Sequence, residues 1–173
     1  ELGLDDRDGA VAAEAGHQPR VGYRGAPIRG FPGSPNLRVL GQECDLLLLA
    51  VGPAEVRSVV QELQPGPQHR VVLATQGLEP ETGSWLSDVI GQESAALRVG
   101  ALAGPVLAEE VLNRRPSAFV AASPYEEVRI LAQEALHSAV CRVYTTSDLR
   151  GVELASAMVG VLAVALGASE ALS

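Results

Sequence analysis

The chain has 173 residues and is 47% hydrophobic, which suits one globular domain, or one domain and the beginning of a second. Its 13 basic and 21 acidic residues give a formal charge of −8, which argues against a strong global attraction to DNA or RNA. Every basic residue is arginine, and aromatic residues make up only 3%, so the core must be built from Val, Leu, Ala and Ile.

The N-terminal part of the chain predicts little regular structure. Residues 1–8 are compatible with the end of a strand, and residues 9–15 with a short helix. Residues 16–36 are rich in Gly, Pro and Arg, which predicts a loop.

From residue 45 onward, apolar runs alternate with helical patterns, which is typical of βαβ units. Strands are expected over residues 45–51, 70–75, 97–103, 118–122 and 140–144. Helices are expected from Pro53 to Leu63, around 85–90, over 106–113, from 124 to about 137, and from Gly151 to the end. The predicted fold class is α/β, a mostly parallel sheet with flanking helices.

Cysteine usage and hydropathy favour a reduced, cytoplasmic protein. Cys44 and Cys141 are the only cysteines, too few for a disulfide framework and without metal-site spacing. The longest apolar stretch, residues 158–168, is shorter than the roughly 20 residues of a membrane span, so no span is predicted. No charged segment followed by an apolar run opens the chain, as a signal peptide requires.

Four ordered segments carry a family resemblance. They are Asp45–Val51, then Ala74-Thr-Gln-Gly-Leu-Glu-Pro-Glu-Thr-Gly83, then Ala103-Gly-Pro-Val-Leu-Ala-Glu-Glu-Val111, and finally Arg142–Asp148 with Gly151-Val-Glu-Leu154. In this order they resemble the bacterial type of NAD(P)-dependent glycerol-3-phosphate dehydrogenases, which have Thr-Lys-Gly-Leu-Glu and Ser-Gly-Pro-Ser-Phe-Ala-Lys-Glu-Val at the second and third. The resemblance covers nearly the whole chain.

The resemblance implies a Rossmann-like fold in two parts. Residues 1–148 would form a partial NAD(P)-binding domain, and residues 149–173 the first helix of a C-terminal α-helical domain. The family opens with a strand and a Gly-rich turn that holds the cofactor pyrophosphate at a helix N-terminus. Neither is found here, so the chain is expected to lack both, as a fragment or a truncated gene product, and to bind NAD or NADP weakly at best.

The family's chemistry follows from the same resemblance. It is hydride transfer between sn-glycerol 3-phosphate, or dihydroxyacetone phosphate, and NAD(P), for phospholipid precursor supply. The resemblance implies a small phosphorylated substrate as a partner. It is also compatible with a second copy of the chain in a homodimer.

Two positions depart from the family where its chemistry needs a lysine. Gln76 stands where the family's lysine touches both substrate and cofactor, and Gln can only hydrogen-bond. Val159 stands where the family's lysine accepts the substrate proton, and loss of a positioned general base costs roughly 10²- to 10⁴-fold in rate. No intact catalytic residue is therefore predicted. The alternatives are a plain polar strand end for Gln76 and, as the favoured interpretation, core packing for Val159.

Other site residues come from the same motifs. Gly104 matches the turn that brings backbone N–H groups to the substrate, although Gly-Pro alone is merely a loop signal. Val106 replaces a substrate-binding hydroxyl residue, and Glu109 replaces a lysine. Gly52 and Ala108 are expected near the cofactor.

The N-terminal charges allow two interpretations. Arg7 could face a cofactor 2′-phosphate, with Asp5 or Asp6 on the ribose, or all three could form a solvated cluster. The basic run of residues 15–42 could likewise cover a nucleotide phosphate, although a solvated loop is the commoner case. Its members are His17, Arg20, Arg24, Arg29 and Arg38. No partner can be named for His69 or His137, and no metal site or catalytic triad is predicted.

Two functions remain in competition. The first is an oxidoreductase of the glycerol-3-phosphate dehydrogenase family. The second is a non-catalytic relative that binds a nucleotide or a protein partner, and the residues at positions 76, 106 and 159 favour it for this chain.

Overall fold

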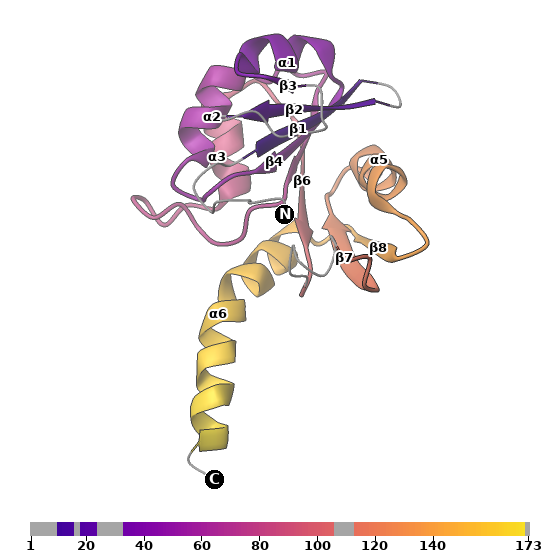
Figure 1. Ribbon diagram of the computed structural model, residues 1–173. Helices are drawn as coiled ribbons and strands as arrows, with labels where there is room; N and C mark the ends of the chain where they lie inside the picture. Colours follow the sequence, from indigo (N-terminus) through magenta and orange to yellow (C-terminus); the bar gives the residue numbers. More distant parts are fainter. Residues whose placement is uncertain (1–9, 16–17, 24–32, 106–112, 172–173) are drawn as a thin grey trace.

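The protein is a mixed eight-stranded sheet with helices on both faces and one long helix that extends away from it (Figure 1). The computed structural model describes residues 10–15, 18–23, 33–105 and 113–171. The strands are β1 Ala10–Ala15, β2 Gln18–Tyr23, β3 Gly33–Ser34, β4 Leu46–Ala50, β5 Arg70–Leu73, β6 Arg98–Ala103, β7 Ser117–Ala122 and β8 Cys141–Thr146. The helices are α1 Leu37–Glu43, α2 Val56–Leu63, α3 Leu86–Glu93, α5 Glu126–Leu136 and α6 Leu149–Ala171.

The strand order is β3-β2-β1-β4-β5-β6-β7-β8. The central strands β4, β5 and β6 are parallel and are joined through α2 and α3, as the alternating sequence pattern predicts. Strand β7 pairs antiparallel with β6, and β8 then runs parallel to β7. The predicted α/β class with a mostly parallel sheet is confirmed, since four of the seven strand pairings are parallel.

The core lies in two layers, one on each face of the sheet. Successive side chains of a strand point to opposite faces, so alternate residues of the aliphatic strands divide between the layers. Leu47, Leu49, Val71 and Leu73 pack with α1, α2 and α3. Their neighbours Leu48, Val72 and Leu102 lie in the second cluster, with Val128 and Ala132 of α5. Because both faces are covered, these strands are apolar throughout rather than alternating.

The N-terminal predictions were wrong in two places. Residues 9–15 were expected as a helix, yet 10–15 form strand β1, which is antiparallel to both β2 and β4. The loop expected over 16–36 contains β2 and β3. Alanine favours helices locally, but pairing with two neighbouring strands supplies hydrogen bonds that a local propensity cannot register.

Helix α1 lies inside the segment that was interpreted as a basic loop. The side chain of Asn36 accepts a hydrogen bond from the Val39 N–H at 3.3 Å and caps the helix. Leu37 and Leu40 are buried in the core. Helix α1 is thus held by a cap and an apolar face, both of which are visible in the sequence.

Helix α6 has 23 residues and is anchored only at its beginning. The Asp148 carboxylate accepts from the Gly151 N–H at 2.8 Å, whereas Leu166 near the far end is 68% exposed. By length and composition alone the helix could cross a membrane, whereas the apolar stretch of residues 158–168 predicted no span. The small residues before position 158 lengthen the apolar segment. One such helix is weak support for a membrane protein, because core helices of soluble proteins meet the same criteria.

Candidate ligand-binding site

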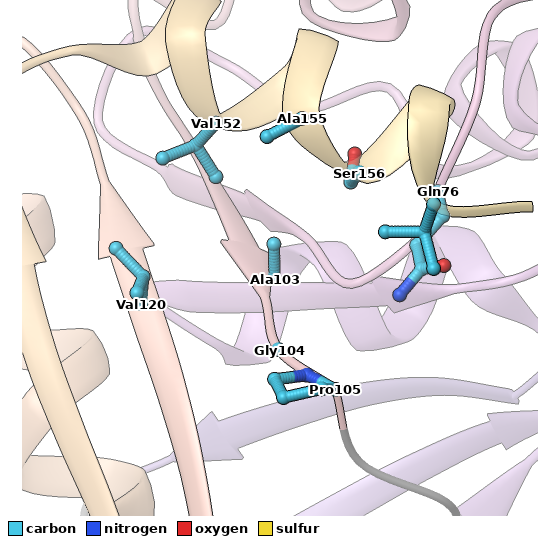
Figure 2. A pocket seen from close by; sticks show the side chains of 9 residues that line it. Gln76, Ala103, Gly104, Pro105, Val120, Val152, Ala155 and Ser156 are labelled. Atoms are coloured by element: carbon cyan, nitrogen blue, oxygen red, sulfur yellow. The ribbon is translucent and has the colours of Figure 1, made fainter. Parts of the chain in front are cut away.

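A pocket of about 220 Å³ lies between the carboxyl ends of β5 and β6, strand β7 and helix α6 (Figure 2). It is lined by Gln76, Ala103, Gly104, Pro105, Val120, Val152, Ala155, Ser156 and Val159. Open parallel sheets bind ligands at the carboxyl ends of their strands. The structure therefore brings together three residues, Gln76, Gly104 and Val159, that the sequence singled out from segments far apart.

The turn after β5 presents Gln76. The Thr75 hydroxyl donates to the Val51 carbonyl at 2.8 Å and ties the end of β5 to the end of β4. Gly77 follows with φ +105°, in the left-handed region that glycine adopts without strain. This reversal leaves Gln76 exposed at the rim of the pocket.

Gly104 has a packing role that needs no substrate. A Cβ atom at this position would lie 2.5 Å from the Ala118 carbonyl oxygen, so glycine lets the end of β6 approach β7. The sequence interpretation, that glycine lets the backbone approach a substrate, is not needed to explain the residue. Both roles are compatible, because Gly104 also lines the pocket.

Buried polar contacts hold α6 over the pocket. Glu153 is 5% exposed, and its carboxylate accepts from the Ser87 N–H at 3.0 Å and the Ser87 hydroxyl at 2.7 Å. Arg150 pairs with Asp88 and lies 5.4 Å from the centroid of the Trp85 ring, within cation–π range. These contacts fix the first turns of α6 against the start of α3.

Val159 is another of the residues that line this pocket. It is 51% exposed, so the expectation that it packs in a core is wrong for the part of the chain that the structure describes. Its isopropyl group carries no proton and accepts none. Of the nine lining residues only Gln76 and Ser156 have polar side chains, and neither is charged.

Sequence comparison identifies the family. A family model for the N-terminus of NAD-dependent glycerol-3-phosphate dehydrogenase matches residues 33–129, more than half of the chain. The chain belongs to this family. It is 40% identical over 124 residues to the glycerol-3-phosphate dehydrogenase [NAD(P)+] of Acinetobacter baumannii strain SDF, covering 71% of the chain and 35% of that relative. The Acinetobacter baylyi enzyme is 36% identical over 137 residues, covering 79% and 38%.

Solved structures agree with this assignment. The crystal structure of glycerol-3-phosphate dehydrogenase from Coxiella burnetii matches with a TM-score of 0.73 and 26% identity, over 82% of this chain and 44% of that one. The Rossmann-like fold and the resemblance to NAD(P)-dependent oxidoreductases are thereby confirmed, and α6 is the helix that begins the family's helical domain. The chain spans little more than a third of the length of the curated relatives it matches.

Gly52, expected near the cofactor of this family, follows β4 and is not among the residues that line the pocket. Its N–H donates to the Glu55 carboxylate at 3.2 Å, and its carbonyl accepts from the Glu55 N–H at 2.9 Å. The Glu55 carboxylate therefore already accepts the hydrogen bond of the backbone N–H that follows β4. That arrangement disfavours a second anion there.

A polar cluster between α2 and α3 was not found from the sequence. Arg57 donates to both carboxylate oxygens of Glu79, at 2.6 and 2.8 Å, and also pairs with Glu93. The Arg57 hydrogen bonds and one from Thr82 hold the pKa of Glu79 down at about 2, and the pKa of Arg57 rises. Glu79 belongs to the Gln-Gly-Leu-Glu motif, so this cluster anchors the turn that carries Gln76.

Both histidines without a predicted partner have one. His69 is buried, and its Nε2 donates to the Gly41 carbonyl at 2.6 Å while Nδ1 accepts from the Gly66 N–H at 2.7 Å. The Nδ1 atom of His137 accepts from the Val143 N–H at 3.4 Å. Both are structural, and among the described residues no cluster of His, Cys, Asp and Glu could hold a metal ion.

Several predicted residues lie outside the described ranges, so the structure does not place them. They are Asp5, Asp6, Arg7, His17, Arg24, Arg29, Val106, Ala108 and Glu109, and the helix expected over 106–113 falls there except for its last residue. Of the basic run, Arg20 belongs to β2, and Arg38 of α1 donates to the Gln64 side chain at 2.6 Å. Arg38 is thus engaged within the fold.

Proposed function

We propose that this chain is a member of the glycerol-3-phosphate dehydrogenase family that binds a ligand in the α6 pocket without transferring hydride. One observation carries the proposal. Gln76 and Val159 line the same pocket, and these are the two positions where the resemblance puts lysines. An amide and an isopropyl group can neither hold a positive charge nor accept a proton at neutral pH.

The wider assignment is part of the same proposal. Residues 1–148 would be the nucleotide-binding part and residues 149–173 the start of the helical domain, in a cytoplasmic protein. The family's cofactor is NAD or NADP, and its substrate is a small phosphorylated alcohol or ketone. At the end of β4 the described groups do not suit a cofactor phosphate, because Glu55 holds the Gly52 N–H. We therefore derive no hydride step and expect weak cofactor binding.

A turnover assay of the full chain tests the proposal. Purified protein, with its folded state checked by circular dichroism, is mixed with dihydroxyacetone phosphate and NADH or NADPH, and the absorbance of the reduced cofactor is followed. The expected rate equals the protein-free background. Clear turnover, abolished by the cavity-filling variant Ala155→Phe, would overturn the proposal.

A second candidate function, binding to a protein partner, is supported by α6. Beyond its anchored start the helix exposes large apolar side chains, which soluble proteins rarely leave uncovered as a group. They are Leu154, Met158, Val161, Leu162, Val164 and Leu166. Further sequence of the helical domain that α6 begins, or a second copy of the chain, would cover them, and sedimentation equilibrium over a concentration series tests the second copy. A monomer at every concentration excludes the homodimer.

A further inference from the structure

A second pocket, of about 270 Å³, lies on the strands at one edge of the sheet. All seven residues that line it belong to β7, to β8 or to the turns that precede these strands, and Arg142 and Tyr144 of β8 are among them. None of the seven lines the α6 pocket. Strands β7 and β8 are parallel and are joined through α5 (Figure 1), so this pocket is a separate site built by one βαβ unit.

The pleat of β8 places Arg142 and Tyr144 on the face that α5 does not cover. Their neighbour Val143 is buried in the cluster that includes α5, and successive side chains of a strand point to opposite faces. Ala118 is the register partner of Arg142, and its small methyl group forms the floor of the pocket. Tyr144 is 59% exposed and Arg142 is exposed as well. An aromatic ring and a guanidinium group are therefore accessible side by side to a ligand from the solvent.

These two strands carry only positive charge, in a chain that is acidic as a whole. Residues 113–122 and 138–147, which contain β7, β8 and the turns before them, include Arg114, Arg115 and Arg142 but no Asp or Glu, whereas the whole chain has 21 acidic and 13 basic residues. None of the three arginines pairs with a described carboxylate, although one arginine in each of α2, β6 and α6 does. The positive charge at this edge is therefore available to an anion from outside the fold.

The groups that line the pocket define a ligand class. A guanidinium group binds a carboxylate or a phosphate through two parallel hydrogen bonds. An exposed tyrosine ring stacks with another aromatic ring. Val140, which is 40% exposed, and Pro116 add apolar wall. The volume of about 270 Å³ is slightly below the roughly 300–1,000 Å³ of clefts that hold drug-sized ligands, so one ring with one anionic group suits it.

We propose that this pocket binds a small aromatic anion, in which one ring carries a carboxylate or a phosphate group. The ring stacks on Tyr144 above Ala118, and the anionic group pairs with Arg142. Arg114 and Arg115, in the turn before β7, raise the local positive potential. The proposal does not rest on the proposed function, because the two pockets share no residue.

Five probes separate the contribution of the charge from that of the ring. The full chain is titrated with benzoate, phenyl phosphate, benzamide, acetate and inorganic phosphate, and the resonances of the Ala118 methyl group and the Tyr144 ring are followed by NMR. We expect benzoate and phenyl phosphate to bind with dissociation constants on the order of millimolar, as suits ligands of this size. The tighter of the two identifies the anionic group. Benzamide lacks the charge, and acetate and inorganic phosphate lack the ring, so each should bind about tenfold more weakly.

Three results of the titrations would overturn the proposal. They are no binding of either aromatic anion, binding of benzamide or of the ringless anions as tight as that of their aromatic anionic counterparts, and shifts confined to other residues.

Removal of the pocket's arginine tests the charge directly. Arg142→Gln should lower the affinity for benzoate and phenyl phosphate about tenfold and leave that for benzamide unchanged. Arg70→Gln is the matched control, because Arg70 of β5 neither lines the pocket nor pairs with a described carboxylate, and its loss changes the net charge equally. It should bind the probes as the wild type does. An equal loss in both variants would mean that net charge, and not Arg142, attracts the anion, which contradicts the proposal.

Two further variants test the floor and the ring. Ala118→Phe should abolish binding, and Tyr144→Leu should bind benzoate no more tightly than acetate. Both side chains are exposed, so these substitutions leave the buried core intact, and circular dichroism checks the fold. Full affinity for benzoate in a folded Ala118→Phe variant would overturn the proposal. Turnover of dihydroxyacetone phosphate would refute the proposed function and leave this site unaffected.

Discussion

The region between α2 and α3 and the region under α6 differ in how their side chains are engaged. In the first, Arg57 joins Glu79 and Glu93 across two helices and a turn, above a layer of buried aliphatic residues. In the second, seven of the nine residues that line the pocket are apolar, and the Gln76 side chain has no hydrogen-bond partner among the described residues. The first region holds the Rossmann-like fold together, whereas the positions where the resemblance puts lysines carry neutral groups.

The largest difference should appear when one leucine is truncated in each region. Leu47→Ala in β4 removes a fully buried side chain, so we expect a loss of about 3 kcal/mol in the free energy of unfolding. Leu166→Ala on α6, where the side chain is 68% exposed, should change it by less than about 0.5 kcal/mol. Urea denaturation followed by circular dichroism measures both. Similar losses would mean that α6 is buried in solution.

The second-largest effect on stability is expected for the contact between Glu153 and Ser87, which joins the two regions. Glu153→Ala leaves the Ser87 N–H and hydroxyl without their acceptor, so we expect a loss of about 2 kcal/mol in unfolding free energy. Leu154→Ala, the exposed neighbour on the same helix, serves as the control and should have little effect. If both variants unfold at the urea concentration of the wild type, Glu153 does not anchor α6.

The polar cluster of Arg57, Glu79 and Glu93 should make the free energy of unfolding depend on pH. The pKa of Glu79 is lowered from 4.5 to about 2 by Arg57 and Thr82, so its stabilisation is complete above pH 4.5 and is lost as pH falls towards 2. Glu79→Gln should flatten this part of the profile. Urea midpoints at pH 5, 4, 3 and 2.5 measure the slope, with Glu81→Gln as the matched control. An unchanged slope in Glu79→Gln would show that other groups cause the acid sensitivity.

The smallest effect is expected at the sheet edge formed by β8. The Gln133 side chain donates to the Val143 carbonyl at 2.7 Å, and His137 accepts from the Val143 N–H, so two outward backbone groups of the edge strand are covered. Gln133→Ala should cost about 1 kcal/mol in unfolding free energy and increase self-association. Light scattering and urea denaturation measure the two effects.

The neighbouring variant Glu134→Ala is the control for that edge, because Glu134 is exposed on the same helix. It should leave both quantities as in the wild type. If Gln133→Ala and Glu134→Ala aggregate equally, the side chain of Gln133 does not protect the edge.

Most of the central fold could be predicted from the sequence. Aliphatic runs such as Leu46–Ala50 and Arg70–Leu73 identified buried strands, and the spacing of Val56, Val59 and Val60 identified α2. Such patterns succeed because a strand buried on both faces, or a helix buried on one, imposes a local rule on its own residues. The strand ends that carry Gln76 and Gly104 could be located for the same reason.

Contacts between distant segments could not be predicted in this way. Strand β1 forms because it pairs with β2 and β4. The position of the Glu79 carboxylate is set by a hydrogen bond from Arg57, which lies on another element. The helix expected from residue 124 begins at Glu126, and just before it the Ser123 hydroxyl donates to the Val99 carbonyl at 2.7 Å and accepts from the Tyr125 N–H at 3.2 Å. Each case depends on a partner far along the chain, which no local pattern contains.

By itself the sequence determined the α/β class, the order of the central elements, and the neutral residues at positions 76 and 159. Only the tertiary structure decided that these two positions share one pocket and that Val159 lies open rather than in a core. Strand and helix patterns depend on residues that are neighbours in the chain. A pocket depends instead on contacts between distant segments, such as the buried contact of Glu153 with Ser87 that holds α6 in place.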